Sequence, residues 1–183
     1  MWREQLESIA LSQARASHLV DQLLALALAD EGRTGLQRAT LRLDELAQQA
    51  VLRQLARADA QGVDLGALGL DEAVMVEANA ALVEGILDNL IDNALRYGGR
   101  TITIELAGRT LAVVDDGPGI PPEAQRDLMK RWAQGPAGQK LGQGAGLGLA
   151  IVARYAKLLG AELGFAKASH DGGLRVSIAF PPT

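Results

Sequence analysis

The feature that most constrains the fold is a run of alternating glycines that leads directly into a helix-forming segment. The run holds Gly142, Gly144, Gly146 and Gly148, and it continues into the apolar stretch from Leu147 to Leu159. Unpaired N–H groups at the start of a helix, aided by the helix dipole, favour phosphate groups. The run is not a Walker A loop, because no Gly-Lys-Ser/Thr follows, nor a dinucleotide fingerprint, because no strand enters it directly. The alternative is a flexible loop that closes a helix.

A second segment, LVEGILDNLIDNALRYG at residues 82–98, lies on a predicted helix that begins at Asn79 as N-cap and runs to about Arg96. Its apolar stripe, which would pack on a sheet, consists of Leu87, Leu90, Ile91 and Ala94. A neighbouring face holds the polar residues Asn89, Asn93, Arg96 and Tyr97. Such a face can bind an anionic ligand with an aromatic part, and an Asn oxygen suits Mg²⁺. The alternative is an ordinary solvated face.

A third segment, VVDDGPGIPP, places a carboxylate where an apolar strand ends. Asp115 follows Val113 and Val114 and precedes Gly117 and Gly119. An ionised carboxylate only accepts hydrogen bonds, so it can bind an exocyclic amine, and the glycines allow a flat ring to approach the backbone closely. A simple Asp-Gly turn is the alternative for this segment alone.

The remaining pattern predicts a compact α/β unit with a long loop at 117–145, where Gly and Pro are dense. We expect a short strand over 41–43, and a helix capped by Asp44 that runs to about Ala58. Further expected elements are strands over 63–70 and 73–77, a hairpin through Gly108-Arg109, a helix over 147–159 ended by Gly160, and two closing strands joined through residues 170–173.

Residues 2–30 are predicted to form one helix with a heptad seam. The seam consists of Leu6, Ile9, Gln13, Ala16, Val20, Leu23 and Ala27. A single seam needs a partner helix, so we expect a homodimer through residues 2–30.

Composition removes several function classes. The 183 residues include no Cys and two His, His18 and His170, which excludes disulfides and thiolate chemistry and disfavours a His-built metal site. The net charge of −4 argues against nucleic acid as a partner. No apolar run reaches the roughly 18–20 residues of a membrane span, and the N-terminus lacks the layout of a signal peptide. We therefore expect a cytoplasmic protein.

The three segments together, in this order, resemble the N, G1 and G2 boxes of the catalytic ATP-binding (GHKL) domain of bacterial two-component sensor histidine kinases. The resemblance covers about residues 40–182, and residues 2–30 are similar to part of the second dimerisation helix of that family. It implies an α+β, two-layer sandwich of the Bergerat type, with a mixed sheet packed on helices and a long N-terminal helix before it. The implied domains are 1–32, the dimerisation helix and linker start, and 33–183, the catalytic domain with an ATP lid at about 117–145.

The resemblance also implies roles for individual residues. Asn93 would hold Mg²⁺ against the phosphates of ATP, with Asn89 one turn earlier, and Arg96 would lie near the phosphates. Tyr97 would lie beside the adenine, and Asp115 would accept from the adenine amine. The remaining implied nucleotide-binding residues are Gly117, Gly119 and Ile120 in the G1 box and Gly144, Gly146, Leu147, Gly148 and Leu149 in the G2 box.

The implied lid departs from the family pattern in one place. The run LMKRWAQG, residues 128–135, has Met129 and Trp132 where Phe is usual, and Gln134 where a second Arg is common. Arg131 is kept and is the implied catalytic contact to phosphate. A lost positive charge near the γ-phosphate would weaken turnover, so a nucleotide-binding regulatory module without turnover is the alternative function.

ATP-hydrolysing relatives of this fold, such as gyrase, carry a Glu four residues before the metal-binding Asn, where it activates water. Here that position is Asn89, which favours phosphoryl transfer over hydrolysis.

Neither His18 nor His170 lies in an acceptor motif of the family. The implied function is transfer of the ATP γ-phosphoryl group to a His on a separate dimerisation domain, with a response regulator downstream in the full-length protein. The chain would be a fragment that does not autophosphorylate alone, from the cytoplasmic part of an inner-membrane receptor. A Ser/Thr-directed kinase of the same fold is disfavoured by the heptad helix.

Overall fold

The computed structural model describes residues 37–121, 147–169 and 172–182. The N-terminal seam, most of the expected lid, Arg131, Gly144 and Gly146 lie outside these residues. The described part belongs to one compact unit that begins at Gln37. Its elements are β1 (Ala39–Arg42), α2 (Leu43–Gln61), β2 (Asp64–Leu68), β3 (Met75–Ala78), α3 (Ala80–Tyr97), β4 (Thr101–Ala107), β5 (Thr110–Asp115), α5 (Leu147–Leu159), β6 (Glu162–Ser169) and β7 (Gly172–Ala179).

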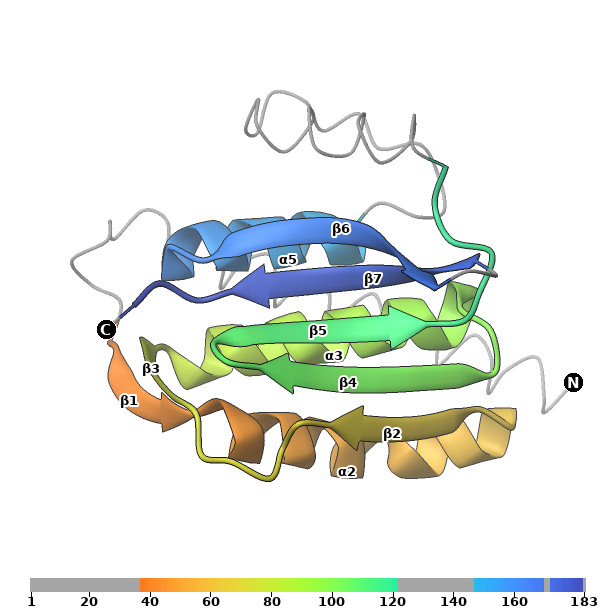
Figure 1. The fold of residues 1–183 in the computed structure, drawn as a ribbon, viewed down its shortest axis with the longest axis horizontal. Coiled ribbons are helices and arrows are strands. Elements are labelled where there is room, and N and C mark those ends of the chain that lie inside the picture. Colours follow the sequence, from red (N-terminus) through yellow and green to blue (C-terminus); the bar gives the residue numbers. More distant parts are fainter. Residues whose placement is uncertain (1–36, 122–146, 170–171, 183) are drawn as a thin grey trace, which may run out of the picture. The chain divides into compact units, whose positions relative to one another are not determined.

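The main sheet has five strands in the order β2-β4-β5-β7-β6 (Figure 1). Only β2 and β4 pair in parallel; β4 with β5, β5 with β7 and β7 with β6 are antiparallel, which makes the sheet mixed. β1 and β3 form a separate antiparallel pair at one end of the domain.

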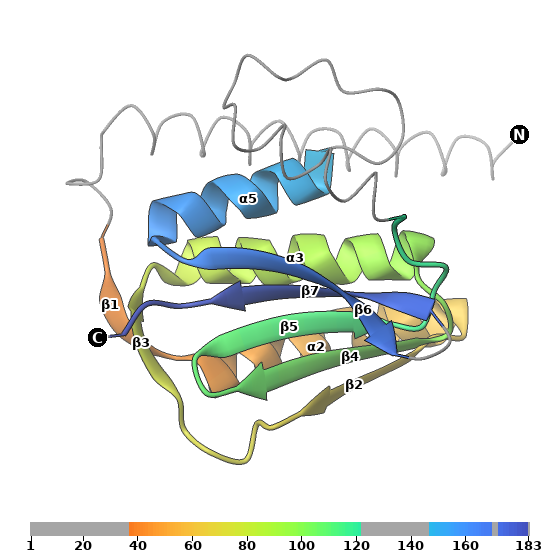
Figure 2. The ribbon, with the colours of Figure 1, turned by 45° about the horizontal axis from the view of Figure 1, so that its top comes forward.

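The three helices α2, α3 and α5 lie side by side on one face of this sheet (Figure 2). The two layers meet in an apolar core in which Leu87 and Ile91 of α3, Ile102 and Ile104 of β4, and Val152 of α5 are almost fully buried. This arrangement confirms the expected two-layer α+β fold with a mixed sheet packed on helices. None of the helices in the described residues is long and apolar enough to cross a bilayer.

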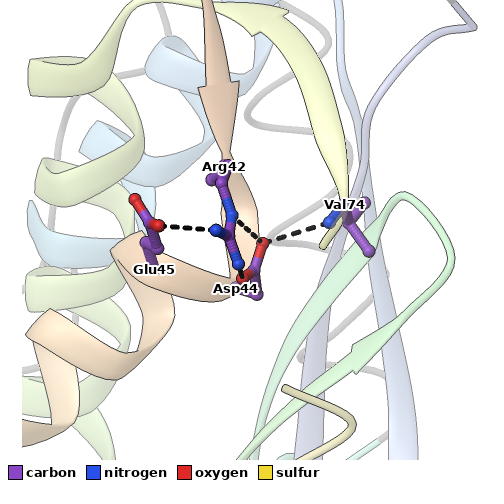
Figure 3. Close-up of polar contacts among 4 residues, drawn as sticks. All are labelled: Arg42, Asp44, Glu45 and Val74. Atoms are coloured by element: carbon purple, nitrogen blue, oxygen red, sulfur yellow. Dashed lines mark hydrogen bonds and ion pairs between the residues drawn. The ribbon is translucent and has the colours of Figure 1, made fainter. Parts of the chain in front are cut away.

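The start of α2 differs from the sequence-based prediction. The helix begins at Leu43, and Arg42 is its N-cap residue without a capping side chain. Asp44 is buried within the first turn, where it pairs with Arg42 and its Oδ1 accepts from Val74 N at 3.0 Å (Figure 3). The predicted cap was therefore wrong, because Asp44 binds the loop before β3 rather than its own helix. The helix also runs three residues beyond Ala58, to Gln61.

Other predictions hold at the level of elements. Asn79 caps α3, since its side chain accepts from Leu82 N. Gly108 in the hairpin and Gly160 after α5 both have positive φ values, as turns and helix ends require. The closing strands are longer than predicted, because Gly172 and Gly173 belong to the β7 ladder rather than to the turn.

The point where the chain enters this unit is fixed to two helices. Arg38 Nη2 donates to the carbonyl oxygens of Leu158 and Leu159, at the C-terminal end of α5. The Asn79 side chain, at the N-terminal end of α3, donates to the carbonyl of Gln37 at 2.9 Å. A guanidinium is well placed at the negative end of a helix dipole.

Candidate functional site

One face of α3 carries the two carboxamides of the predicted N box toward α5. Asn89 and Asn93 are one turn apart, and Gly85 lies one turn before Asn89 on the same stripe. The Nδ2 of Asn89 donates to the carbonyl of Gly85 at 2.8 Å, which leaves its Oδ1 directed away from its own helix backbone. Asn89 is thus held in one orientation by α3 itself.

The first turn of α5 lies directly against these carboxamides. A Cβ added to Gly148 would be 3.0 Å from Asn93 Nδ2, 3.1 Å from Asn93 Oδ1 and 3.4 Å from Asn89 Oδ1. A side chain here would compete with both Asn residues for the same space. The structure therefore brings together residues of the N and G2 boxes that are more than 50 positions apart in sequence.

Asn93 has an unusual environment for a carboxamide. Its Nδ2 is buried and has no hydrogen-bond partner among the described residues. A buried donor without a partner costs about 1–3 kcal/mol relative to a satisfied one. A polar group that enters from outside the described residues would relieve that cost.

Asp115 ends β5 next to α3. Its Oδ1 accepts from Gly117 N at 2.9 Å, and Leu174 N of β7 also donates to this residue. Burial raises the pKa of Asp115 above its usual value, although these backbone donors oppose the shift. A half-buried carboxylate of this kind gains from a further donor that satisfies its remaining lone pairs.

Glycines surround Asp115 and keep side chains away from it. A Cβ on Gly117 would lie 2.7 Å from the Cα of Gly98, and one on Gly98 would lie 3.0 Å from the Cβ of Asp115. Gly119, with φ of 70°, packs on the carbonyl of Gly173, whose N–H donates to Gly117 O at 2.7 Å. The sequence singled out Gly117 and Gly119 but missed Gly98 and Gly173, which only the tertiary structure brings to this corner. Ile120 follows, half-buried.

The guanidinium of Arg96 forms an ion pair within α3. Its Nε pairs with Asp92 Oδ2 at 2.8 Å, and Asp92 Oδ1 pairs with Arg57 of α2 at 2.6 Å. The guanidinium of Arg96 is therefore directed to a carboxylate that also pairs with α2, whereas Asn89 and Asn93 lie against Gly148 of α5. Tyr97, at the last position of α3, exposes 51% of its surface.

Asp116, the second acidic residue of the predicted G1 box, has a structural role. Its Oδ1 accepts from Thr101 N at 2.8 Å, and this backbone hydrogen bond lowers the pKa of Asp116. The two adjacent carboxylates thus differ: Asp116 is engaged by the start of β4, and Asp115 faces the glycine-lined corner. Of the remaining predicted residues, Leu149 is buried and Leu147 is the first residue of α5.

Comparison with known proteins assigns this arrangement to a family. Residues 78–183, more than half of the chain, match the family described as "Histidine kinase-, DNA gyrase B-, and HSP90-like ATPase". The chain belongs to this family. The matched region begins at the end of β3 and contains α3, β5 and α5, so it includes every element that contributes to the candidate site.

Relatives of this ATPase domain are sensor proteins. The chain is 35% identical over 160 residues to Sensor protein QseC of Salmonella typhi, a match that covers 86% of the chain and 35% of the relative. It is 34% identical to Sensor protein kinase PmrB of Pseudomonas aeruginosa over 96% of the chain and 37% of the relative. The chain therefore spans about a third of the length of the curated relatives it matches.

Solved structures agree with this assignment. The cytoplasmic segment of histidine kinase QseC superposes with a TM-score of 0.64 at 25% identity, covering 93% of this chain and 95% of that one. Full-length ShkA, solved in complex with AMPPNP, superposes with a TM-score of 0.66 at 24% identity, over 91% of this chain and 36% of that one, a likeness that shows the fold. The predicted resemblance to histidine kinase catalytic domains is confirmed.

Proposed function

We propose that this ATPase-family domain binds Mg–ATP and transfers the γ-phosphoryl group to a His on a separate dimerisation domain. The observation that carries the proposal is the contact between Gly148 and the two carboxamides of Asn89 and Asn93. This contact places the N-terminal, positive end of the α5 dipole beside the carboxamides of α3. The helix end and the N–H groups would bind phosphates, and the carboxamide oxygens would bind their metal counterion.

Asn93 is the residue proposed to hold Mg²⁺. The described residues contain no cluster of His, Cys, Asp or Glu that could hold a metal ion alone. The site therefore fits a cation that needs few protein ligands. Mg²⁺ is such a cation, because it keeps several waters and binds phosphate oxygens together with one or two protein oxygens. The Nδ2 of the same side chain, which is buried and has no partner in the described part of the chain, supports a polar ligand at this position. When bound, the ion would neutralise charge on the phosphates.

Asp115 is proposed to recognise the base. Its ionised carboxylate accepts hydrogen bonds only, so it would select a ring with an exocyclic amine, as adenine has. The glycines at positions 98 and 117 pack closely on each other and on Asp115, so no side chain from either position lies beside the carboxylate. Tyr97, Gly119 and Ile120 complete this end of the proposed nucleotide site. Its phosphate end is completed by Leu147, Leu149, Gly144 and Gly146, and by Arg96 once the guanidinium leaves its ion pair with Asp92.

Transfer rather than hydrolysis is proposed because the site lacks a general base at Asn89. Its Nδ2 is already donated to the carbonyl of Gly85, and a carboxamide does not take up a proton at neutral pH. Phosphoryl transfer depends mainly on positioning and charge stabilisation, so the nucleophile can come from another domain. A His ring nitrogen would attack the γ-phosphorus while the bond to the ADP oxygen breaks.

The wider proposal follows the sensor-kinase relatives. Residues 1–32 would belong to a dimerisation helix that pairs in a homodimer, residues 33–183 would form the catalytic domain, and residues 117–145, with Arg131, its lid. A response regulator would receive the phosphoryl group. The whole protein would be an inner-membrane receptor, with this part in the cytoplasm.

The test measures two steps separately. Titration calorimetry should show Mg–ATP binding that Asn93→Asp weakens at least about tenfold, with Gln49→Ala on the exposed face of α2 as a matched carboxamide control. Labelled ATP should then give phosphohistidine on a supplied dimerisation domain of a sensor kinase. Unchanged affinity in Asn93→Asp would refute the site assignment.

The sequence departure at Gln134 favours a second candidate, a nucleotide-binding regulatory module without turnover. The same experiment separates the two. Mg–ATP binding without phosphohistidine, even on the native acceptor domain, would support the regulatory module and refute the kinase.

A further inference from the structure

We propose that Gly85 and Tyr155 form a positioning contact that sets the distance between α3 and α5 at the nucleotide site. This inference rests on the proposed function, because its consequence is read in the affinity for Mg–ATP. Neither residue is among the predicted nucleotide-binding residues: Gly85 lies on the segment that resembles the N box, one turn before Asn89, and Tyr155 lies seven residues after Gly148.

The contact is a close one between a ring and a backbone. A Cβ added to Gly85 would lie 2.7 Å from Cε2 and 3.3 Å from Cδ2 of Tyr155. Distances below about 3.4 Å between carbon atoms are repulsive, since the optimum is about 3.5–4.0 Å. Tyr155 exposes only 2% of its surface, so its ring is confined and cannot swing away into solvent. A methyl group at position 85 must therefore push α5 away from α3.

A second glycine contact lies at the other end of the same helix pair. Gly148 of α5 packs on Asn93 and Asn89 of α3, just as Gly85 of α3 packs on Tyr155 of α5. Position 85 is eight residues before Asn93, and position 155 is seven residues after Gly148. The two helices therefore run antiparallel, with contacts about 10–12 Å apart at 1.5 Å per residue. Helices are stiff over two turns, so a displacement at Tyr155 moves Gly148 relative to Asn93.

Gly85 is also linked directly to the site. Its carbonyl accepts the hydrogen bond from Asn89 Nδ2 that holds that carboxamide in place. A glycine inside a helix costs roughly 0.5–1 kcal/mol relative to alanine, so the position gives up helix stability. We infer that the close approach of Tyr155, and the helix spacing it fixes, is the property that requires glycine here.

The test compares three variants of the whole chain by Mg–ATP titration calorimetry. Gly85→Ala should weaken Mg–ATP binding at least about fivefold. The control is Gly66→Ala in β2, where an added Cβ meets nothing within 4 Å and φ is not positive; its affinity should be unchanged. The double variant Gly85→Ala/Tyr155→Leu, in which the clashing ring atoms are gone, should bind within about twofold of the unaltered chain.

A second measurement reports geometry without nucleotide. In the ¹⁵N–¹H spectrum of the free protein, the side-chain amide of Asn93 should shift in Gly85→Ala and return in the double variant, while Gly66→Ala leaves it in place. If Gly85→Ala does not fold, Tyr155→Leu alone, which removes the ring that sets the helix spacing, should also displace the Asn93 amide and weaken binding; an unchanged amide and affinity would refute the contact. A merely structural role would lower the melting temperature without moving the affinity or the Asn93 amide.

The outcomes distinguish the two proposals. If the unaltered chain binds Mg–ATP and Gly85→Ala binds equally well, the positioning contact is refuted and the proposed function stands. A double variant as weak as Gly85→Ala also refutes it, because relief of the clash then restores nothing. If the unaltered chain does not bind Mg–ATP, the proposed function fails, and this inference fails with it.

Discussion

Asp44 is the only charged side chain that is buried among the described residues. It connects the first turn of α2 to Val74, the residue before β3, and Arg42 neutralises it (Figure 3). Removal of the Asp44 carboxylate would leave the Val74 N–H without this acceptor and Arg42 without its buried partner. Asp44→Ala should lower the free energy of unfolding by about 1–3 kcal/mol in urea denaturation. Glu45→Ala, which removes an exposed ion pair to the same Arg42, should cost about 0–1 kcal/mol. Equal effects of the two variants would contradict this role.

The same carboxylate predicts a dependence of stability on pH. The hydrogen bond and charge of Arg42 lower the pKa of Asp44 below its ordinary value, despite desolvation. A lowered pKa in the folded state means that the stabilisation is complete above the ordinary pKa and is lost as pH falls through the lowered one. The difference in free energy of unfolding between the unaltered chain and Asp44→Asn should therefore be largest near neutral pH and shrink in acid. A difference that grew on acidification would contradict the assignment.

Asp115 should respond to substitution in the opposite way. Since burial raises the pKa of Asp115, the folded state disfavours its charge, and that charge lowers stability above the raised pKa. Asp115→Asn keeps an acceptor for Gly117 N and removes the charge. We expect unchanged or higher thermal stability, with Mg–ATP affinity at least about tenfold weaker. Asp116→Asn is the matched control: it should lose stability, because its carboxylate accepts from Thr101 N, but keep its affinity. Tight ATP binding by Asp115→Asn would refute its role at the base.

At the scale of elements, α2 and α3 are joined by ion pairs rather than by glycine contacts. Asp92 of α3 pairs with both Arg57 and Arg96, and Asp88 pairs with Arg53 at 3.2 Å. These side chains are partly exposed, so each pair contributes little to stability and is screened by salt. Asp92→Ala should lower the free energy of unfolding by about 0–1 kcal/mol at low ionic strength and by less in high salt. Asp88→Ala, which removes a single ion pair between the same two helices, is the control. A large loss of unfolding free energy that persists in high salt would contradict the assignment of Asp92 to weak, screened ion pairs.

The elements also show where prediction from sequence reached its limit. The cap at Asn79 was predictable because its partner, Leu82 N, is three residues away. The role of Asp44 was not, because Val74 is 30 residues distant and the local pattern of a helix cap was equally compatible with the sequence. For Arg96, helical spacing gave the approximate face, but Asp92 one turn earlier determines where the guanidinium points. Gly85 gave no signal at all, since its partner Tyr155 is on another helix.

At the scale of the whole molecule, the predicted seam in residues 2–30 concerns assembly. We expect the full chain to be a homodimer through this segment, and residues 37–183, which form their own compact unit, to be monomeric. Light scattering across a range of concentrations would measure the molar mass of the full chain and of residues 37–183. Mg–ATP affinity should be the same for the full chain and for residues 37–183, because the proposed site lies within residues 89–149 of the compact unit. A monomeric full chain at high concentration would contradict the predicted seam.

The attachment of Arg38 to the end of α5 has a mechanical consequence for the whole domain. Residues 37 and 38 hold the N-terminal end of α3 and the C-terminal end of α5, whereas Asn93 and Gly148 lie toward the opposite ends of the same two helices. From Gly148 to Leu159 the axis of α5 measures about 16 Å at 1.5 Å per residue. A displacement of residues 37 and 38 would therefore reach α3 and α5 at the ends that lie away from Asn93 and Gly148, with the Gly85–Tyr155 contact between those ends and the phosphate end of the proposed site.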